Sequence, residues 1–147
     1  MNDLEFAKIK YQTNEFTFVI VRNARVIVTG TRDGIGELLQ VVAAQGDALH
    51  GAALADKIVG KAVAMVAIYA GMTAIYTPLG SELAEQTLQA HHVAFQADKI
   101  VPRIQNKRGD GLCPMEQLTL DLDDPSDAVQ ALSAFVAQKR TPAIQNS

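Results

Sequence analysis

Two short stretches of this 147-residue chain place reactive or charged side chains beside small ones. The first is D-K-I-V-G-K-A at residues 56–62, which precedes the most apolar segment of the chain. The second is G-D-G-L-C-P-M-E at residues 109–116, which holds the only cysteine. Packing alone would not require these residue types, so both stretches are candidates for a functional site.

The first stretch predicts an anion-binding site. The apolar run from Asp56 to Ala70 predicts a buried helix, on which Lys57, Gly60 and Lys61 share one stripe. Free N–H groups at a helix N-terminus favour a negative charge, and small side chains allow a ligand to come close. We therefore predict that Lys61 binds a small anionic molecule. In the alternative interpretation, Asp56 only caps the helix and both lysines extend to solvent.

The second stretch predicts a thiol with nucleophilic or redox character. Cys113 precedes Pro114 and stands three residues before Glu116, which is typical of the N-cap of a short helical turn. A helix N-terminus and the nearby cations Lys107 and Arg108 would lower the pKa of the thiol. The alternative is that Cys113 is an inert packing residue, as most lone cysteines are.

The elements that must position these stretches alternate between strand and helix. A β-hairpin is predicted over 16–22 and 25–29, and further strands over 52–55, 73–77 and 93–97. Helices are predicted over 4–11, 35–46, 56–70 and 82–91, with a last helix that begins at 124–127. This order predicts an α/β layered domain. Its hairpin would leave a sheet edge at which two copies of the chain could pair as a homodimer.

Composition limits the class of protein. The length and the 48% hydrophobic content predict a single domain over residues 1–140, followed by a polar tail at 141–147. The net charge of −3 and the scattered basic residues predict that nucleic acid is not a partner. The apolar runs are too short to span a bilayer, so no membrane partner is expected. The N-terminal residues have no signal-peptide pattern, which favours a cytoplasmic location.

Taken together and in this order, the two motifs resemble a bacterial family of uncharacterised proteins with a cytidine-deaminase-like fold. The resemblance covers about residues 3–120. It implies a three-layer α/β/α sandwich with a mixed sheet of about five strands, to which the last helix is an addition. It implies no established activity. The positions that it marks are Asp56, Lys57, Gly60, Lys61, Asn106, Cys113, Pro114 and Glu116, with Lys107 or Arg108 in the place of an arginine expected directly after the asparagine.

The deaminase mechanism is not expected to accompany that fold. Zinc deaminases hold their metal with a His or Cys two residues before a catalytic Glu, and with a P-C-x-x-C motif on the next helix. Neither motif is present, and the three histidines do not replace them. We therefore predict no deaminase-type zinc site and no other cofactor.

Three classes of function stay open at this stage. In the first, which we favour, Asp56, Lys57, Gly60 and Lys61 bind a small anionic or nucleotide-like molecule. In the second, Cys113 is the nucleophile of a thiol-dependent enzyme, with Lys61 stabilising charge and Asp56 or Glu116 moving protons. In the third, both motifs serve only structure or self-association.

Overall fold

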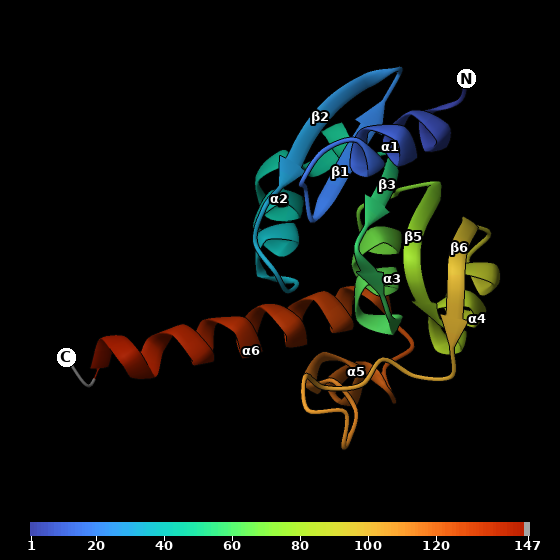
Figure 1. Ribbon diagram of the computed structural model, residues 1–147. Helices are drawn as coiled ribbons and strands as arrows, with labels where there is room; N and C mark the ends of the chain where they lie inside the picture. The colour runs from blue at the N-terminus through green and yellow to red at the C-terminus, as the bar shows by residue number, and fades with distance from the viewer. Residues whose placement is uncertain (146–147) are drawn as a thin grey trace.

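The computed structural model has a mixed six-stranded sheet with helices on both faces, and it describes the backbone of residues 1–145 and the side chains of residues 1–139 (Figure 1). The predicted α/β layered class is therefore confirmed. In chain order the elements are α1 (Asp3–Gln12), β1 (Phe18–Arg22), β2 (Arg25–Gly30), α2 (Gly36–Gln45), the 3-10 helix η1 (Gly46–Leu49), β3 (Ala53–Asp56), β4 (Ile58–Val59), α3 (Lys61–Tyr69), β5 (Ala74–Ser81), α4 (Glu82–Ala90), β6 (Ala94–Val101), α5 (Pro114–Thr119) and α6 (Pro125–Gln145).

Two hydrophobic cores lie on opposite faces of the sheet because successive strand residues point to opposite sides. In β1, Phe18 and Ile20 pack into the larger core, which α2, α3, α4 and α6 cover. Val19 and Val21 point the other way, into a smaller core beneath α1. Figure 1 shows α1 in front of the sheet, and α3 and α4 behind it.

The strands β3 and β4 act as one strand with a break between them. Both pair in parallel with β5. Ala53 lies opposite Ala74 and Ile58 lies opposite Leu79, so the sequence offset between paired residues is the same for both strands. The break falls at Lys57, whose backbone N–H donates to the carbonyl oxygen of Thr17. The chain therefore reaches the end of the sheet at Gly60 before it turns into α3.

This arrangement corrects the predicted helix over 56–70. Residues 53–59 are strand, and the helix begins only at Lys61, with Gly60 as its N-cap. Ile58 and Val59 are β-branched residues that extend the sheet, and their pairing with β5 fixes them there. Lys57 and Gly60 therefore do not lie on the helical stripe that the spacing predicted.

Most of the other strands and helices begin close to their predicted positions, but β5 and β6 continue to Ser81 and Val101, past their predicted ends at 77 and 97. Asn2 accepts a hydrogen bond from the Glu5 N–H at the start of α1, and Ser81 accepts one from Ala84 at the start of α4. The strand β2 forms one edge of the sheet, and its pairing with a second copy stays a prediction.

The helix α6 differs from prediction at its end. It continues through the predicted tail to Gln145, and residues 146–147 lie outside the described part of the chain. Figure 1 shows that it extends past α2 toward the C-terminus. Among the described residues, no helix is both long and apolar enough to cross a membrane.

Candidate functional site

The two sequence motifs meet at the N-terminus of α3. Glu116, from α5, is 2% exposed, and its Oε1 accepts a hydrogen bond from the Ala62 N–H at 3.2 Å. Gly60 makes this approach possible, because a Cβ at position 60 would overlap the Glu116 carboxylate. Since Gly60 has no side chain with which to cap α3, the carboxylate of Glu116 acts as its cap.

The Glu116 carboxyl has a raised pKa. Burial is the main cause, because it disfavours the charged form. Backbone hydrogen bonds from Ala62 and Lys61 and the positive charge of Lys61 act in the opposite direction. The second carboxyl oxygen, Oε2, is buried and has no hydrogen-bond partner among the described residues. The site thus contains a buried carboxyl group of which only one oxygen accepts a hydrogen bond from the described residues.

Lys61 is the first residue of α3 and is only 8% exposed. Its Nζ donates a hydrogen bond to the Leu120 carbonyl oxygen at 2.9 Å. Within residues 1–139, no carboxylate lies within the 4.0 Å of an ion pair with this ammonium. An ammonium has three donors, so Lys61 combines burial with a charge that has no ion-pair partner within residues 1–139.

Lys61 also lines a groove of about 340 Å³ between α3 and α4, which we call the Lys61 groove. Polar groups come from α4 and from the connection between α5 and α6, and apolar groups complete the walls. The lining residues are Lys61, Met65, Leu83, Gln86, Thr87, Ala90, His91 and Asp123. Its volume is in the range of small-molecule sites.

The other predicted residues of the first motif lie outside this groove. Asp56 ends β3 and is half-buried, and burial raises the pKa of its carboxyl to about 7, although the backbone N–H groups of Lys57 and Ile58 donate to it. The Lys57 side chain is 55% exposed, and its Nζ forms an ion pair with Asp33 at 3.2 Å. Of the two lysines, only Lys61 is therefore placed to hold a buried ligand.

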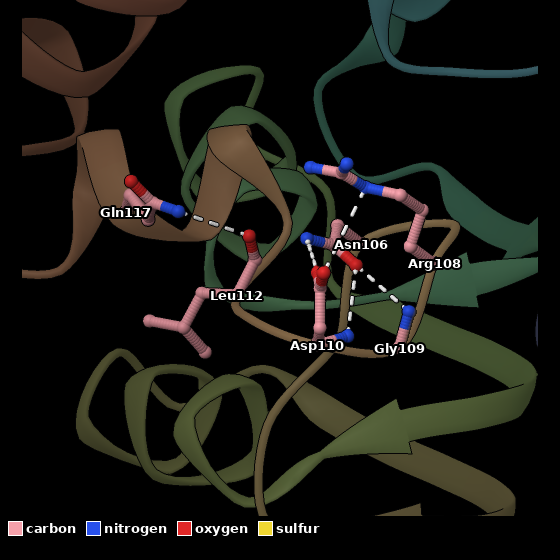
Figure 2. Close-up of polar contacts among 6 residues, drawn as sticks. All are labelled: Asn106, Arg108, Gly109, Asp110, Leu112 and Gln117. Atoms are coloured by element: carbon pink, nitrogen blue, oxygen red, sulfur yellow. Dashed lines mark hydrogen bonds and ion pairs between the residues drawn. The ribbon is translucent and has the colours of Figure 1, made fainter.

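Asn106 organises the loop before α5, as Figure 2 shows. Its Oδ1 accepts hydrogen bonds from the Gly109 N–H at 2.8 Å and the Asp110 N–H at 3.3 Å, and its Nδ2 donates to Asp110 Oδ1 at 2.9 Å. Arg108 lies on the outside of the same loop, where its Nε is 3.8 Å from Asp110 Oδ2 and its side chain is 83% exposed. Both residues make these contacts within the loop, so their contacts indicate a structural role.

Cys113 is the N-cap residue of α5, as predicted, but its side chain makes no capping hydrogen bond. Its backbone N–H donates to the Ile104 carbonyl and its carbonyl accepts from the Gln117 N–H, both at 3.0 Å. The side chain is half-buried. The side chain of this motif that hydrogen-bonds to the start of α3 is that of Glu116.

The groove residues of α4 were not found from the sequence. Gln86, Thr87 and His91 recur at helical spacing on the side of α4 that faces α3, but an amphipathic helix with polar residues gives no separate signal for a groove. Asp123 lines the groove, whereas the start of α6 is capped by Asp124, whose Oδ1 accepts from the Ser126 and Asp127 N–H groups.

A second cavity of about 450 Å³ lies between α2, the end of α3 and α6, and it contains none of the predicted site residues. Over the described residues, no three His, Cys, Asp or Glu side chains are grouped as metal ligands. The Lys61 groove is therefore the cavity that connects the sequence motifs to a possible ligand.

Comparison with known proteins gives a family and a fold. The profile of the family described as TM1506, a domain of unknown function (DUF1893), matches residues 7–136. The crystal structure of a DUF1893 family protein (TM1506) from Thermotoga maritima superposes with a TM-score of 0.81 at 23% identity, covering 91% of this chain and 90% of that chain. The search of curated proteins finds no match. At this identity the structural likeness shows the fold alone.

Proposed function

The chain belongs to the DUF1893 family of domains of unknown function, and from that premise we propose that it binds a small anionic molecule in the Lys61 groove. The observation that carries the proposal is the state of Lys61, whose ammonium is buried without a paired carboxylate among the described residues. A buried charge without an ion-pair partner is costly, and a bound anion would provide one.

The groove favours a ligand with hydroxyl or amino groups beside its negative charge. Gln86 and His91 can donate hydrogen bonds to an anion, whereas the Asp123 carboxylate can accept one from a ligand hydroxyl or amino group. The Thr87 hydroxyl already donates to the Leu83 carbonyl oxygen at 2.8 Å. A sugar phosphate or a nucleotide carries both kinds of group. These classes therefore suit the groove better than an anion without donors.

The proposal is tested by thermal denaturation with sulfate, sugar phosphates and nucleoside monophosphates. A ligand at a hundred times its dissociation constant adds about 2.7 kcal/mol to the free energy of unfolding, which at this size raises the Tm by about 5–10 °C. The informative variant is Lys61→Met, which keeps the apolar stem and removes the charge. We expect the shift in the wild type and its loss in this variant.

Lys57→Met is the matched control, because it removes an exposed lysine of the same motif. It should keep the full ligand shift. An equal shift in Lys61→Met and the wild type would place binding elsewhere, and the absence of a shift with every compound would reject anion binding. Circular dichroism of each variant establishes that it is folded.

The alternative function is a thiol-dependent reaction at Cys113. Its support is the half-buried thiol, which stands three residues before the buried Glu116. Against it, α5 has six residues, too few for a strong helix-end field, and the thiol is not among the groove residues. The rate of alkylation by iodoacetamide from pH 5 to 9 tests it: a rate that stays high below pH 7 would favour this alternative over binding alone.

We also propose that the fold is related to that of the cytidine deaminases. It is supported by the antiparallel β1 and β2 pair beside the parallel strands β3, β5 and β6, with helices on both faces. The chain lacks the H-x-E and P-C-x-x-C motifs of that enzyme class. The proposed function therefore includes a binding step and no deamination step.

A further inference from the structure

We propose that anion binding in the Lys61 groove is coupled to the uptake of one proton by Glu116. This inference rests on the proposed function, and it adds a regulation of the same site: the anion and the proton promote each other's binding. Linkage requires that this effect be reciprocal.

The geometry supplies the place for the proton. The Oε1 atom of Glu116 is occupied by the hydrogen bond from the Ala62 N–H. The Oε2 atom is buried and unpartnered among the described residues, so it is the position at which a proton can be added without the loss of a hydrogen bond. Because a buried carboxylate oxygen without a donor is costly, the neutral acid is the form that suits this position better.

Lys61 connects Glu116 to the groove. Its positive charge favours the ionised form of Glu116, and the same residue lines the groove in which the anion is proposed to bind. An anion beside Lys61 would compensate that charge and repel a second negative charge at the start of α3. Occupation of the groove therefore shifts Glu116 toward its protonated form.

Proton uptake by Glu116 must be distinguished from proton uptake by the other charged groups near these elements. The helix α5 packs against α3 and α6. On α3 the charged group is Lys61, and at the start of α6 the groups are Asp124 and Asp127, of which Asp124 caps the helix. Asp123 and His91 line the groove itself. His91 places a protonatable imidazole in the groove, so it needs its own control.

The test is calorimetry of sulfate binding from pH 5.5 to 8.5, in pairs of buffers that differ in their enthalpy of ionisation. Sulfate is the probe because its own charge is constant over this range. We expect the wild type to take up as much as one proton, with an affinity that falls by up to about tenfold per pH unit between the pKa of Glu116 in the free protein and its higher pKa in the sulfate-bound protein. His91→Gln should keep this proton uptake, and Glu116→Gln should lose it.

A second measurement on the wild type keeps the inference open to refutation if Glu116→Gln fails to fold. The ¹³C chemical shift of the Glu116 carboxyl, followed against pH, should show a midpoint that rises when sulfate is present. Proton uptake that persists in Glu116→Gln, or a midpoint that does not move, would overturn this inference while the proposed function stands. Sulfate binding that is absent, or that is unchanged in Lys61→Met, would overturn both.

Discussion

The Glu116 carboxylate occupies the space in which a Cβ at Gly60 would lie. Gly60, at the end of the sheet, and Glu116, in α5, are thus complementary in shape. The Glu116 carboxylate also accepts a hydrogen bond from the Ala62 N–H. The two sequence motifs are therefore two halves of one local structure.

Gly60→Ala should destabilise the protein, because the new methyl group displaces the Glu116 carboxylate and leaves the start of α3 without its cap. We expect a loss of about 1–3 kcal/mol in the free energy of unfolding, measured by urea denaturation. Gly36→Ala is the control, since its added carbon would meet only Val136 at an ordinary distance of 3.5 Å. A loss of equal size in both variants would contradict the account.

Glu116→Ala should reduce the cost of Gly60→Ala when the two substitutions are combined. With the carboxylate absent, the methyl group at position 60 has room, so the two losses should not add. Urea denaturation of both single variants and the double variant measures this coupling, which we expect to be about 1 kcal/mol or more. Additive losses would show that the two residues act independently.

Asn106→Ala should loosen the loop that precedes α5, because three side-chain hydrogen bonds within residues 106–110 are lost. We expect the free energy of unfolding to fall by about 1–2 kcal/mol, and the Ala62 N–H to exchange its hydrogen faster as Glu116 becomes less fixed. Arg108→Ala removes only an exposed ion pair of the same loop. It should leave both measurements unchanged, and an equal effect of the two variants would refute the assigned role of Asn106.

Asp56 should make the protein less stable as the pH rises. Its pKa is about 7 in the folded chain against an ordinary value of 3.8, so the folded state binds the proton more tightly than the unfolded state. The stabilisation that proton binding at Asp56 gives to the folded state is complete below pH 3.8. It is lost as the pH rises toward 7, by at most about 1.4 kcal/mol per pH unit.

Asp56→Asn removes this titration and keeps an oxygen that can accept from the Lys57 and Ile58 N–H groups. The variant should therefore gain stability relative to the wild type as the pH rises from 4 to 8, because only the wild type loses the stabilisation from proton binding at Asp56. Chemical denaturation at each pH measures it. A difference that does not depend on pH would mean that Asp56 does not titrate in this range.

Local signals predicted most of the fold. Ser81 and Asn2 are capping residues at the starts of helices, and both helices begin where the sequence indicates. The failure at residues 56–60 has a physical cause. Asp56 is a common capping residue before an apolar run, so local preference favours a helix there. The parallel pairing of Ile58 and Val59 with β5 is a tertiary interaction, and it overrides that preference.

The candidate site could be predicted only as two separate halves. Glu116 and Lys61 were both singled out, but nothing local indicates that residues so far apart in the chain meet. The groove was not predicted, since it arises from the packing of α3 against α4. The family resemblance marked Gly60 and Glu116, which the structure brings together at the start of α3, but it gave none of their contacts.

The distance in sequence between Ala62 and Glu116 is 54 residues, and it has a consequence for synthesis on the ribosome. The helix α3 leaves the ribosome without its cap and must wait until α5 has also emerged. During that interval the Ala62 N–H lacks its Glu116 acceptor and the Lys61 ammonium lacks the Leu120 carbonyl that holds it. The order of translation thus makes the site one of the last parts of the protein to form.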